Sequence, residues 1–348
     1  MNLVLPIPIW PEADRVMWER LLRRGGPLDD NGALSHLRAA SLATLEYRYS
    51  RWLGWLSLVE PESLLRLPAD RASLSRLMAW LEALRHLAPM SKLMFVSGTL
   101  RVLSAAAPKV DWGPQRRLEA FLKQSAGRGN PERKRGRVLS SAVLLDAGIK
   151  LATLQADAAT TELSAAKQRR DGTMVAMLAL MPMRRRAFAG LRLNHSIHFS
   201  QNEIVVSLPE EMTKSGLPWE APVPAQVAAL LRRYLNETRP WLMARGRQSH
   251  DYLWVGERGT PFHGLNYFGK RIAEATTRIT GVRVPPHFFR DAAATTLARI
   301  SPESARLIRP ILAHSSLGTA ERHYIQAGTI EAGRDYAAII KSMKRDRR

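Results

Sequence analysis

Apolar residues in the first third of the chain recur at the spacing of an α-helix. One stripe, with three- and four-residue intervals, comprises Leu42, Leu45, Tyr49, Trp52 and Leu56. Prolines separate further helical patterns, which cover residues 72–87, 91–106 and 115–123. No strand pattern lies between them. We therefore predict an all-helical domain over residues 36–125, preceded by an N-terminal leader segment over residues 1–35.

The pattern changes after residue 138, where strand patterns join the helical ones. Helical patterns cover residues 140–155, 171–180, 225–243, 267–277, 288–298, 302–313 and 319–327. Three short strand patterns cover residues 193–199, 203–208 and 219–223. The predicted fold class is mainly α with a small antiparallel β-sheet: an all-helical N-terminal domain and a mixed α+β domain over residues 138–328. A tail over residues 329–348 contains one more helical pattern.

A basic linker over residues 126–137 separates the two predicted domains. It is rich in glycine, and its basic residues are Arg128, Arg133, Lys134, Arg135 and Arg137. A run of this kind is ordinarily a solvated, flexible segment. In the helical domain, Arg38, Arg48 and Arg51 lie mostly off the apolar stripe. All of these basic residues are candidates for contacts with an anionic polymer.

The whole chain of 348 residues is strongly basic. Lys and Arg number 52 and Asp and Glu number 31, which gives a formal net charge of +21 at pH 7. Such an excess indicates a polyanionic partner, either nucleic acid or an anionic membrane surface. The apolar stretches are too short for the roughly 20 residues that span a bilayer, and the N-terminus has no signal-peptide pattern. We therefore expect a cytoplasmic, nucleoid-associated protein that binds DNA or RNA.

Residue types and motifs that are absent from the sequence exclude several kinds of catalytic and metal site. It contains no cysteine, which excludes a disulfide scaffold, Cys-ligated zinc and thiol catalysis. Motifs of zinc metalloproteases, EF-hands, P-loop proteins and serine hydrolases are absent. His195 and His198 stand three positions apart, but no acidic or Cys residue nearby completes a metal site. We expect no metal and no other cofactor.

A scattered set of basic and phenolic residues remains in the second domain. It comprises Arg184, Lys214, His287, Arg290, His314 and Tyr324. His287 and Arg290 stand three apart at a helix start, so both project from one face. His314 ends a helix, and Tyr324 follows ten residues later on the next one. Each residue alone is a weak signal, but their order and their local sequences together are specific.

In this order and context, the residues resemble the tyrosine recombinase (phage integrase) family. The resemblance covers residues 135–328 by motif and the helical N-terminal part by architecture. Arg184 matches the family's first arginine better than its neighbours Arg185 and Arg186, because Phe188 and Leu191 follow at the right spacing. Lys214 corresponds to the hairpin lysine of the family, and His287 and Arg290 correspond to its His-x-x-Arg pair. His314 corresponds to the second histidine and Tyr324 to the nucleophile.

Two positions depart from the family pattern. Ala187 stands three positions after the first arginine, where the family commonly has an acidic residue. Ala313 replaces the usual glycine before the second histidine, and the interval from there to Tyr324 is one residue longer than in the most familiar version. Neither departure removes a catalytic group.

The resemblance implies a reaction in which the Tyr324 oxygen attacks a DNA phosphodiester. The products are a 3′-phosphotyrosyl bond and a free 5′-hydroxyl, which later attacks to rejoin strands without ATP. The guanidinium groups of Arg184 and Arg290 suit the non-bridging oxygens. His287 is the expected proton acceptor, Lys214 the general acid at the leaving oxygen, and His314 a hydrogen-bond donor to the phosphate.

The partners implied are double-stranded DNA with specific recombination sites, a homotetramer of the chain on two synapsed sites, and accessory DNA-bending or directionality proteins. The tail at residues 329–348 resembles the family segment that docks on a neighbouring protomer, with a self-packed helix as the alternative. Two other functions stay open. One is DNA relaxation of the type IB topoisomerase kind. The other is a non-catalytic, architectural DNA-binding protein, which would need neither Tyr324 nor Lys214.

Overall fold

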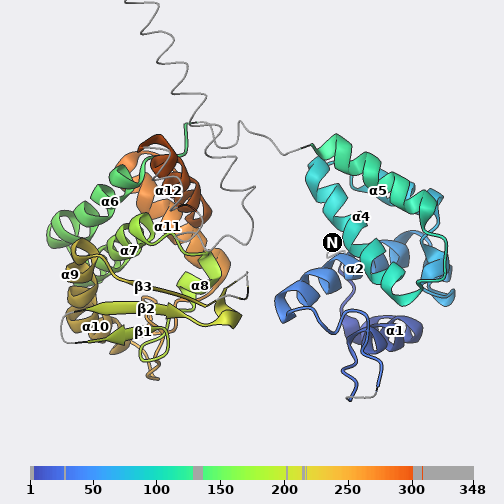
Figure 1. Ribbon diagram of the computed structural model, residues 1–348, viewed down its shortest axis with the longest axis horizontal. Helices are drawn as coiled ribbons and strands as arrows, with labels where there is room; N and C mark the ends of the chain where they lie inside the picture. The colour runs from blue at the N-terminus through green and yellow to red at the C-terminus, as the bar shows by residue number, and fades with distance from the viewer. Residues whose placement is uncertain are drawn as a thin grey trace, which may run out of the picture. The chain divides into compact units, whose positions relative to one another are not determined.

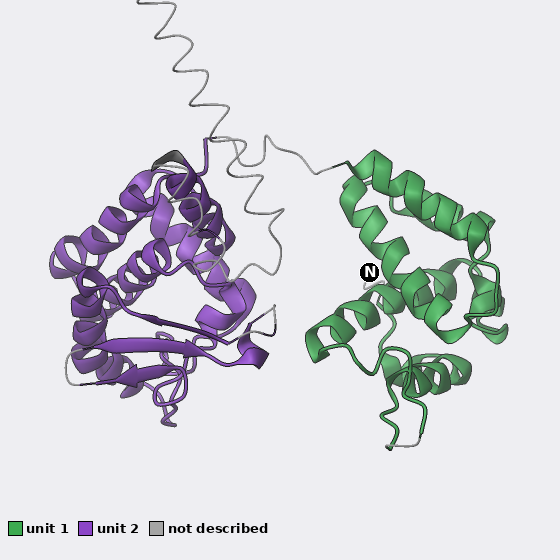
Figure 2. Cartoon of the chain, viewed as in Figure 1, with its two compact units in different colours: residues 1–130 green, residues 131–348 purple. Residues whose placement is uncertain are grey.

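The computed structural model describes residues 4–26, 29–127, 136–200, 203–213, 216, 218–300 and 308. The chain divides into two compact units, Met1–Asn130 and Pro131–Arg348 (Figure 2). This division falls inside the segment that we predicted as a linker, residues 126–137. The predicted fold class is confirmed, because the described residues are mainly helical and contain one small antiparallel sheet.

The described part of unit 1 is helical (Figure 1). Its elements are η1 (Ile7–Ile9), α1 (Glu12–Leu22), α2 (Ala39–Val59), η2 (Pro61–Leu65), η3 (Ala69–Arg71), α3 (Leu74–Ala83), α4 (Pro89–Ala106) and α5 (Gly113–Ala126). The apolar stripe predicted from the sequence is the buried face of α2, where Tyr49, Trp52 and Leu56 have no exposed surface. The Trp52 ring stacks on Trp55 with ring centroids 5.4 Å apart. Tyr49, Trp52 and Trp55 of α2 therefore belong to the core of this unit.

Helix α1 differs from the leader segment that we expected over residues 1–35, because it is part of the core of unit 1. Its Asp14 is fully buried and accepts hydrogen bonds from the Tyr49 hydroxyl at 2.5 Å and from the Arg71 guanidinium at 2.6 Å. A buried carboxylate is stable only when its charge is compensated in this way. The dense charges of α1 hide its helical periodicity in the sequence, whereas the buried ion pair attaches it to α2 and η3.

Unit 2 combines helices with the sheet (Figure 1). Its helical elements are α6 (Ser141–Lys150), the π-helix η5 (Leu151–Gln155), α7 (Glu162–Leu180), α8 (Arg185–Ala189), η6 (Glu210–Met212), α9 (Ala225–Arg233), the π-helix η7 (Tyr234–Thr238), α10 (Arg239–Met243), α11 (Leu265–Thr280) and α12 (Pro286–Ile300). The helix predicted over residues 225–243 is thus interrupted by a π-helical turn. Apart from residue 308, the helical patterns at 302–313 and 319–327 and the one within the tail at 329–348 lie outside the described residues.

The sheet has the strand order β1 (Ile197–Phe199), β2 (Ile204–Leu208), β3 (Trp219–Pro222), with antiparallel neighbours. Val206 in the central strand pairs with Ile197 on one side and Ala221 on the other. Alternate residues of β2 are buried, so one face of the sheet packs on the core of unit 2. The loop between β2 and β3 contains η6 and, outside the described residues, Lys214.

Helix α7 runs through the core of unit 2 and ends just before the candidate Arg184. It is buried on all sides from Asp171 to Ala179. Two glycines allow α6 and the turn after it to approach α7 closely. A Cβ atom at Gly172 would lie 2.4 Å from the backbone nitrogen of Ala152, and one at Gly148 would lie 2.4 Å from that of Ala176. This close packing makes α7 a rigid support for the segment that follows it.

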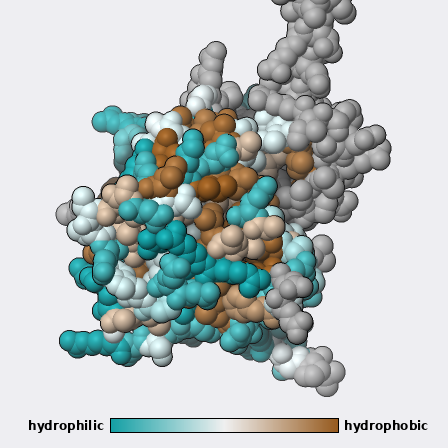
Figure 3. Space-filling model, turned by 90° about the vertical axis from the view of Figure 1, so that its left-hand side faces the viewer, coloured by the Kyte–Doolittle hydropathy of each residue, from teal (hydrophilic) through white to brown (hydrophobic). Residues whose placement is uncertain are grey.

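The surface of unit 2 mixes polar and apolar residues. In the face that Figure 3 presents, polar residues cover most of the area and apolar ones gather between them near the centre. The exposed large apolar side chains among the described residues of the unit are Val143, Leu154, Phe199 and Tyr267. They lie on separate elements, as single exposed apolar residues do on ordinary protein surfaces. No helix in the described part of the chain is long and apolar enough to cross a membrane.

Candidate active site

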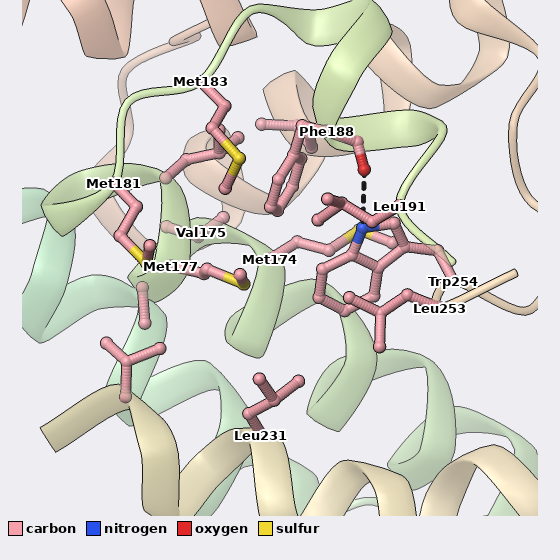
Figure 4. Close-up of a cluster of buried hydrophobic side chains, with 14 of the residues drawn as sticks. Met174, Val175, Met177, Met181, Met183, Phe188, Leu191, Leu231, Leu253 and Trp254 are labelled. Atoms are coloured by element: carbon pink, nitrogen blue, oxygen red, sulfur yellow. Dashed lines mark hydrogen bonds between the residues drawn. The ribbon is translucent and has the colours of Figure 1, made fainter. Parts of the chain in front are cut away.

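Arg184 is the N-cap residue of α8, directly after the turn that ends α7. The short helix is fixed to the core by Phe188, which is fully buried and packs against the Trp254 ring at 5.1 Å. The Trp254 indole donates a hydrogen bond to the Phe188 carbonyl at 3.0 Å, and Leu191 is buried beside this pair (Figure 4). The two apolar residues that selected Arg184 in the sequence therefore hold its helix in place.

Arg290 lies on α12 and is linked to the same turn. Its guanidinium donates a hydrogen bond from Nη1 to the backbone carbonyl of Pro182 at 2.7 Å. The Met183 N–H donates to the Met181 carbonyl at 2.7 Å, which makes Pro182 the central residue of a γ-turn. Both methionines are buried in the core of unit 2 (Figure 4). The turn that precedes Arg184 thus also orients Arg290.

The charge of Arg184 disfavours the charged form of Arg290. Burial, followed by the neighbouring charge of Arg184, lowers the pKa of Arg290 to about 10, whereas Asp291 acts in the opposite direction. Burial also lowers the pKa of Arg184 below its ordinary value. Two cations in a partly desolvated site form a strong binding site for an anion, and their planar forks match the geometry of a phosphate group.

His287 is exposed in the first turn of α12, three residues before Arg290. The next two residues, Phe288 and Phe289, are buried and attach this turn to the core of unit 2. The His287 ring lies edge-on to Phe288 with centroids 4.7 Å apart. The helix spacing therefore directs His287 and Arg290 toward one side of α12, with the histidine in reach of solvent and ligands.

Helix α2 of unit 1 carries three of the basic residues proposed for DNA contacts. Arg38 is its N-cap residue, and Arg48 and Arg51 lie where α2 packs on α4. A Cβ atom at Gly98 would lie 2.2 Å from Arg48 Cδ, so only glycine leaves room for this side chain. The Arg51 guanidinium lies 5.0 Å from the centroid of the Phe95 ring. Burial lowers the pKa of Arg48, and no carboxylate within the described residues pairs with Arg48 or Arg51.

The structure describes only part of the predicted residue set. Lys214, His314, Tyr324, Arg128, Arg133, Lys134 and Arg135 lie outside the described residues. Arg137 is described, and its guanidinium lies 5.2 Å from the centre of the Phe288 ring and donates to the Arg283 carbonyl. His195 approaches Asp251 at 3.4 Å, while His198 lies on β1. The described residues contain no group of three or more potential metal ligands.

The sequence reasoning missed a buried ion network in unit 2. Asp171 on α7 accepts hydrogen bonds from Arg170 at 2.7 Å and from Arg271 on α11 at 2.9 Å. Arg170 also donates to the Val255 carbonyl at 2.9 Å. These contacts connect α7, α11 and the segment around Val255. An Arg-Asp pair just before the apolar stretch Met174–Met183 was the signal in the sequence. Ala187, at the position where the family commonly has an acid, supplies no carboxylate and is buried.

The chain is similar in sequence to members of one protein family. The model of the phage integrase family matches residues 150–329. Two curated relatives, the tyrosine recombinases XerC of Lacticaseibacillus casei and Lacticaseibacillus paracasei, are each 30% identical to the chain over 93 residues. The alignment covers 26% of the chain and 30% of each relative, so it spans less than a third of their length.

Solved recombinase structures show a distant likeness. A XerH site-specific recombinase bound to a palindromic difH substrate, in a post-cleavage complex, is 15% identical with a TM-score of 0.49 over 98% of both chains. XerH in a pre-cleavage complex with difH is 16% identical, with a TM-score of 0.45 over 87% of this chain and 80% of that one. A XerA recombinase is 15% identical, with a TM-score of 0.41 over 90% and 94%. At these values the likeness adds nothing to the match of the family model.

Proposed function

Because the chain belongs to the phage integrase family, we propose that it is a site-specific DNA recombinase. It cleaves and rejoins DNA strands through a 3′-phosphotyrosyl intermediate. Its substrate is double-stranded DNA that carries specific recombination sites. Neither DNA relaxation nor a purely architectural role is favoured by a specific observation.

The observation that carries this proposal is the pair Arg184 and Arg290. Burial and then repulsion from Arg184 lower the pKa of Arg290 to about 10. An anion between the two guanidinium groups removes this repulsion. A phosphodiester fits, because each fork can bind two oxygens, and the charge on the non-bridging oxygens increases in the transition state.

The remaining groups of the set complete a balanced reaction. The Tyr324 oxygen attacks phosphorus, and the bond from phosphorus to the 5′ oxygen breaks. His287 accepts the phenol proton, which is needed because free tyrosine has a pKa near 10. Lys214 gives a proton to the 5′ oxygen as it leaves, and His314 donates a hydrogen bond to the phosphate. A 5′-hydroxyl then attacks the phosphotyrosine, which re-forms the phosphodiester and breaks the bond to the Tyr324 oxygen. The proton transfers run in the opposite direction, and the enzyme is released.

Unit 1 and the basic segment after it hold the DNA in this proposal. Arg48 and Arg51 offer two guanidinium groups on the α2 side of the α2–α4 contact, and the net charge of +21 attracts the duplex from a distance. Two protomers on each of two sites form a homotetramer. The tail at residues 329–348 docks on a neighbouring protomer, and accessory DNA-bending or directionality proteins select the reaction direction.

A nicked suicide substrate tests the proposal, with the DNA that flanks the gene as the source of sites. The short fragment that carries the new 5′-hydroxyl diffuses away and cannot rejoin the strand, so the full-length protein should accumulate as a denaturant-resistant adduct with DNA. Tyr324→Phe should form none, because it loses one oxygen and almost no volume. Tyr336→Phe, which changes another tyrosine of the tail region, should form the adduct normally. An adduct that persists in Tyr324→Phe, or the lack of an adduct in the natural protein, would contradict the proposal.

A second experiment separates recombination from DNA relaxation. It compares a supercoil relaxation assay with a recombination assay on DNA that carries two sites.

A further inference from the structure

A pocket of about 650 Å³ lies beside α8 in unit 2, and none of the catalytic candidates that the structure describes lines it. Its walls come from α8, the loop before β1, η6 and the segment before α11. Arg186 on α8 lines the pocket two positions after Arg184. The pocket is therefore adjacent in the chain to the candidate active site, and its volume exceeds what one phosphate group needs.

Three planar groups form a column in this pocket. The Arg192 guanidinium lies 4.8 Å from the centre of the Tyr252 ring. The Tyr252 and His263 rings stack with centroids 4.8 Å apart and planes 14° apart. Asp251 fixes one end, because it accepts a hydrogen bond from Arg192 Nε at 3.0 Å. His263 is exposed at the other end. Stacked planar groups that end at an exposed ring offer a face for another planar ring.

The charges around the column do not suit a phosphate group. Arg186 and Glu211 line the pocket and are exposed, and no ion pair holds either of them within the described residues. Arg192 is paired with Asp251, which does not itself line the pocket, so Arg186 and Glu211 remain as one cation and one anion. An anion would meet the Glu211 carboxylate as well as the guanidinium groups. A neutral, planar ligand with hydrogen-bonding edges fits this arrangement better.

We infer that this pocket binds a nucleobase of the DNA substrate that has left its duplex. That the nucleobase belongs to DNA rests on the proposed function. The base stacks on His263, and Arg186 and Glu211 contact its edge. A carboxylate accepts a hydrogen bond from an exocyclic amino group, which cytosine, adenine and guanine have and thymine lacks. In a duplex, the neighbouring bases cover both faces of a base and its partner covers its pairing edge. The pocket therefore binds a base of unpaired DNA near the cut strand.

Binding of single-stranded oligonucleotides to the full-length protein tests the stacking contact by fluorescence anisotropy. His263→Ala should weaken the binding of oligodeoxycytidine about tenfold, because base–aromatic stacking contributes roughly 1–3 kcal/mol per base. His263→Phe should restore it, since phenylalanine retains the ring. His198→Ala is the matched control, an exposed histidine on β1 outside the pocket, and should bind as the natural protein does. Unchanged binding by His263→Ala, or no recovery by His263→Phe, would overturn the inference.

The base preference supplies an independent readout. The natural protein should bind oligodeoxycytidine more tightly than oligothymidine of equal length, and Glu211→Gln should reduce this difference. Equal binding of both oligonucleotides, or displacement of them by inorganic phosphate in a manner that depends on His263, would show an anion site instead. The adduct assay on duplex DNA is a separate measurement. Loss of the adduct in the natural protein therefore contradicts the proposed recombinase, whereas the His263 series alone decides the nucleobase pocket.

Discussion

The guanidinium of Arg290 and the carbonyl of Pro182 are joined by a 2.7 Å hydrogen bond across 108 positions of the sequence. The ring of proline holds φ near −65°, close to the roughly −75° of an inverse γ-turn. This turn points the Pro182 carbonyl at Arg290, and the chain reaches Arg184 two residues later. A single rigid turn thus sets the positions of both candidate phosphate-binding arginines.

Replacement of Pro182 by glycine should slow DNA cleavage about tenfold to a hundredfold, because small misplacements of catalytic groups have effects of this size. Glycine allows the turn many conformations, so its carbonyl no longer holds Arg290. DNA affinity should change little. Single-turnover cleavage beside a binding assay measures both quantities. Pro224→Gly, at the start of α9, is the control. In an Arg290→Ala background, Pro182→Gly should cause no further loss. A full additional loss there would show that Pro182 does not act through Arg290.

Arg184→Lys and Arg290→Lys should each abolish most DNA cleavage while DNA binding is largely kept. A lysine ammonium retains the charge but cannot bind two phosphate oxygens as a planar fork does. Adduct formation on the suicide substrate is the measurement. Arg185→Lys is the matched control, because Arg185 is the exposed next residue of the same triplet. If Arg185→Lys lost cleavage and Arg184→Lys kept it, the choice of Arg184 would be wrong.

DNA affinity should fall steeply as the salt concentration rises, and α2 should contribute to this slope. Each phosphate contact adds about 0.9 to the slope of log K against log salt. The double variant Arg48→Ala, Arg51→Ala should therefore reduce the slope by up to about 1.8. Arg85→Ala is the control, since Arg85 is 79% exposed and pairs with Glu82. An unchanged slope in the double variant would mean that neither α2 arginine contacts a phosphate.

The stability of unit 2 should decrease when the pH falls below about 6.5, in part through His250. Burial first, and then the charge of Arg239, lower the pKa of His250 in the folded chain below its ordinary value of 6.5. As the pH falls, the unfolded chain therefore takes up this proton before the folded chain does, and unfolding is favoured. Urea unfolding between pH 8 and pH 5 measures the effect.

Comparison with the variant His250→Gln isolates this effect, because glutamine at this position does not titrate. The free energy of unfolding of the natural protein should fall relative to that of His250→Gln across the same pH range. His198→Gln, at an exposed position on β1, should show the same pH dependence as the natural protein. Parallel pH curves for the natural protein and His250→Gln would contradict the role assigned to His250.

The sequence by itself determined where most helices and strands form. The apolar stripe of α2 and the alternation in β2 are local patterns, and each demands one buried face. The charge excess indicated a polyanionic partner, and the order of the basic and phenolic residues identified the family before any contact was known. These features were predictable because they depend on neighbours within a few positions in the chain.

Contacts between distant residues were decided only by the tertiary structure. The charges of α1 gave no sign that Asp14 is buried against Tyr49 and Arg71. The sequence likewise did not indicate that the carbonyl of Pro182 orients Arg290 or that His263 stacks on Tyr252. Burial, desolvation and hydrogen-bond geometry arise from packing between separate elements, and no local pattern encodes them. The charge, pKa and orientation of the site residues therefore follow from the fold.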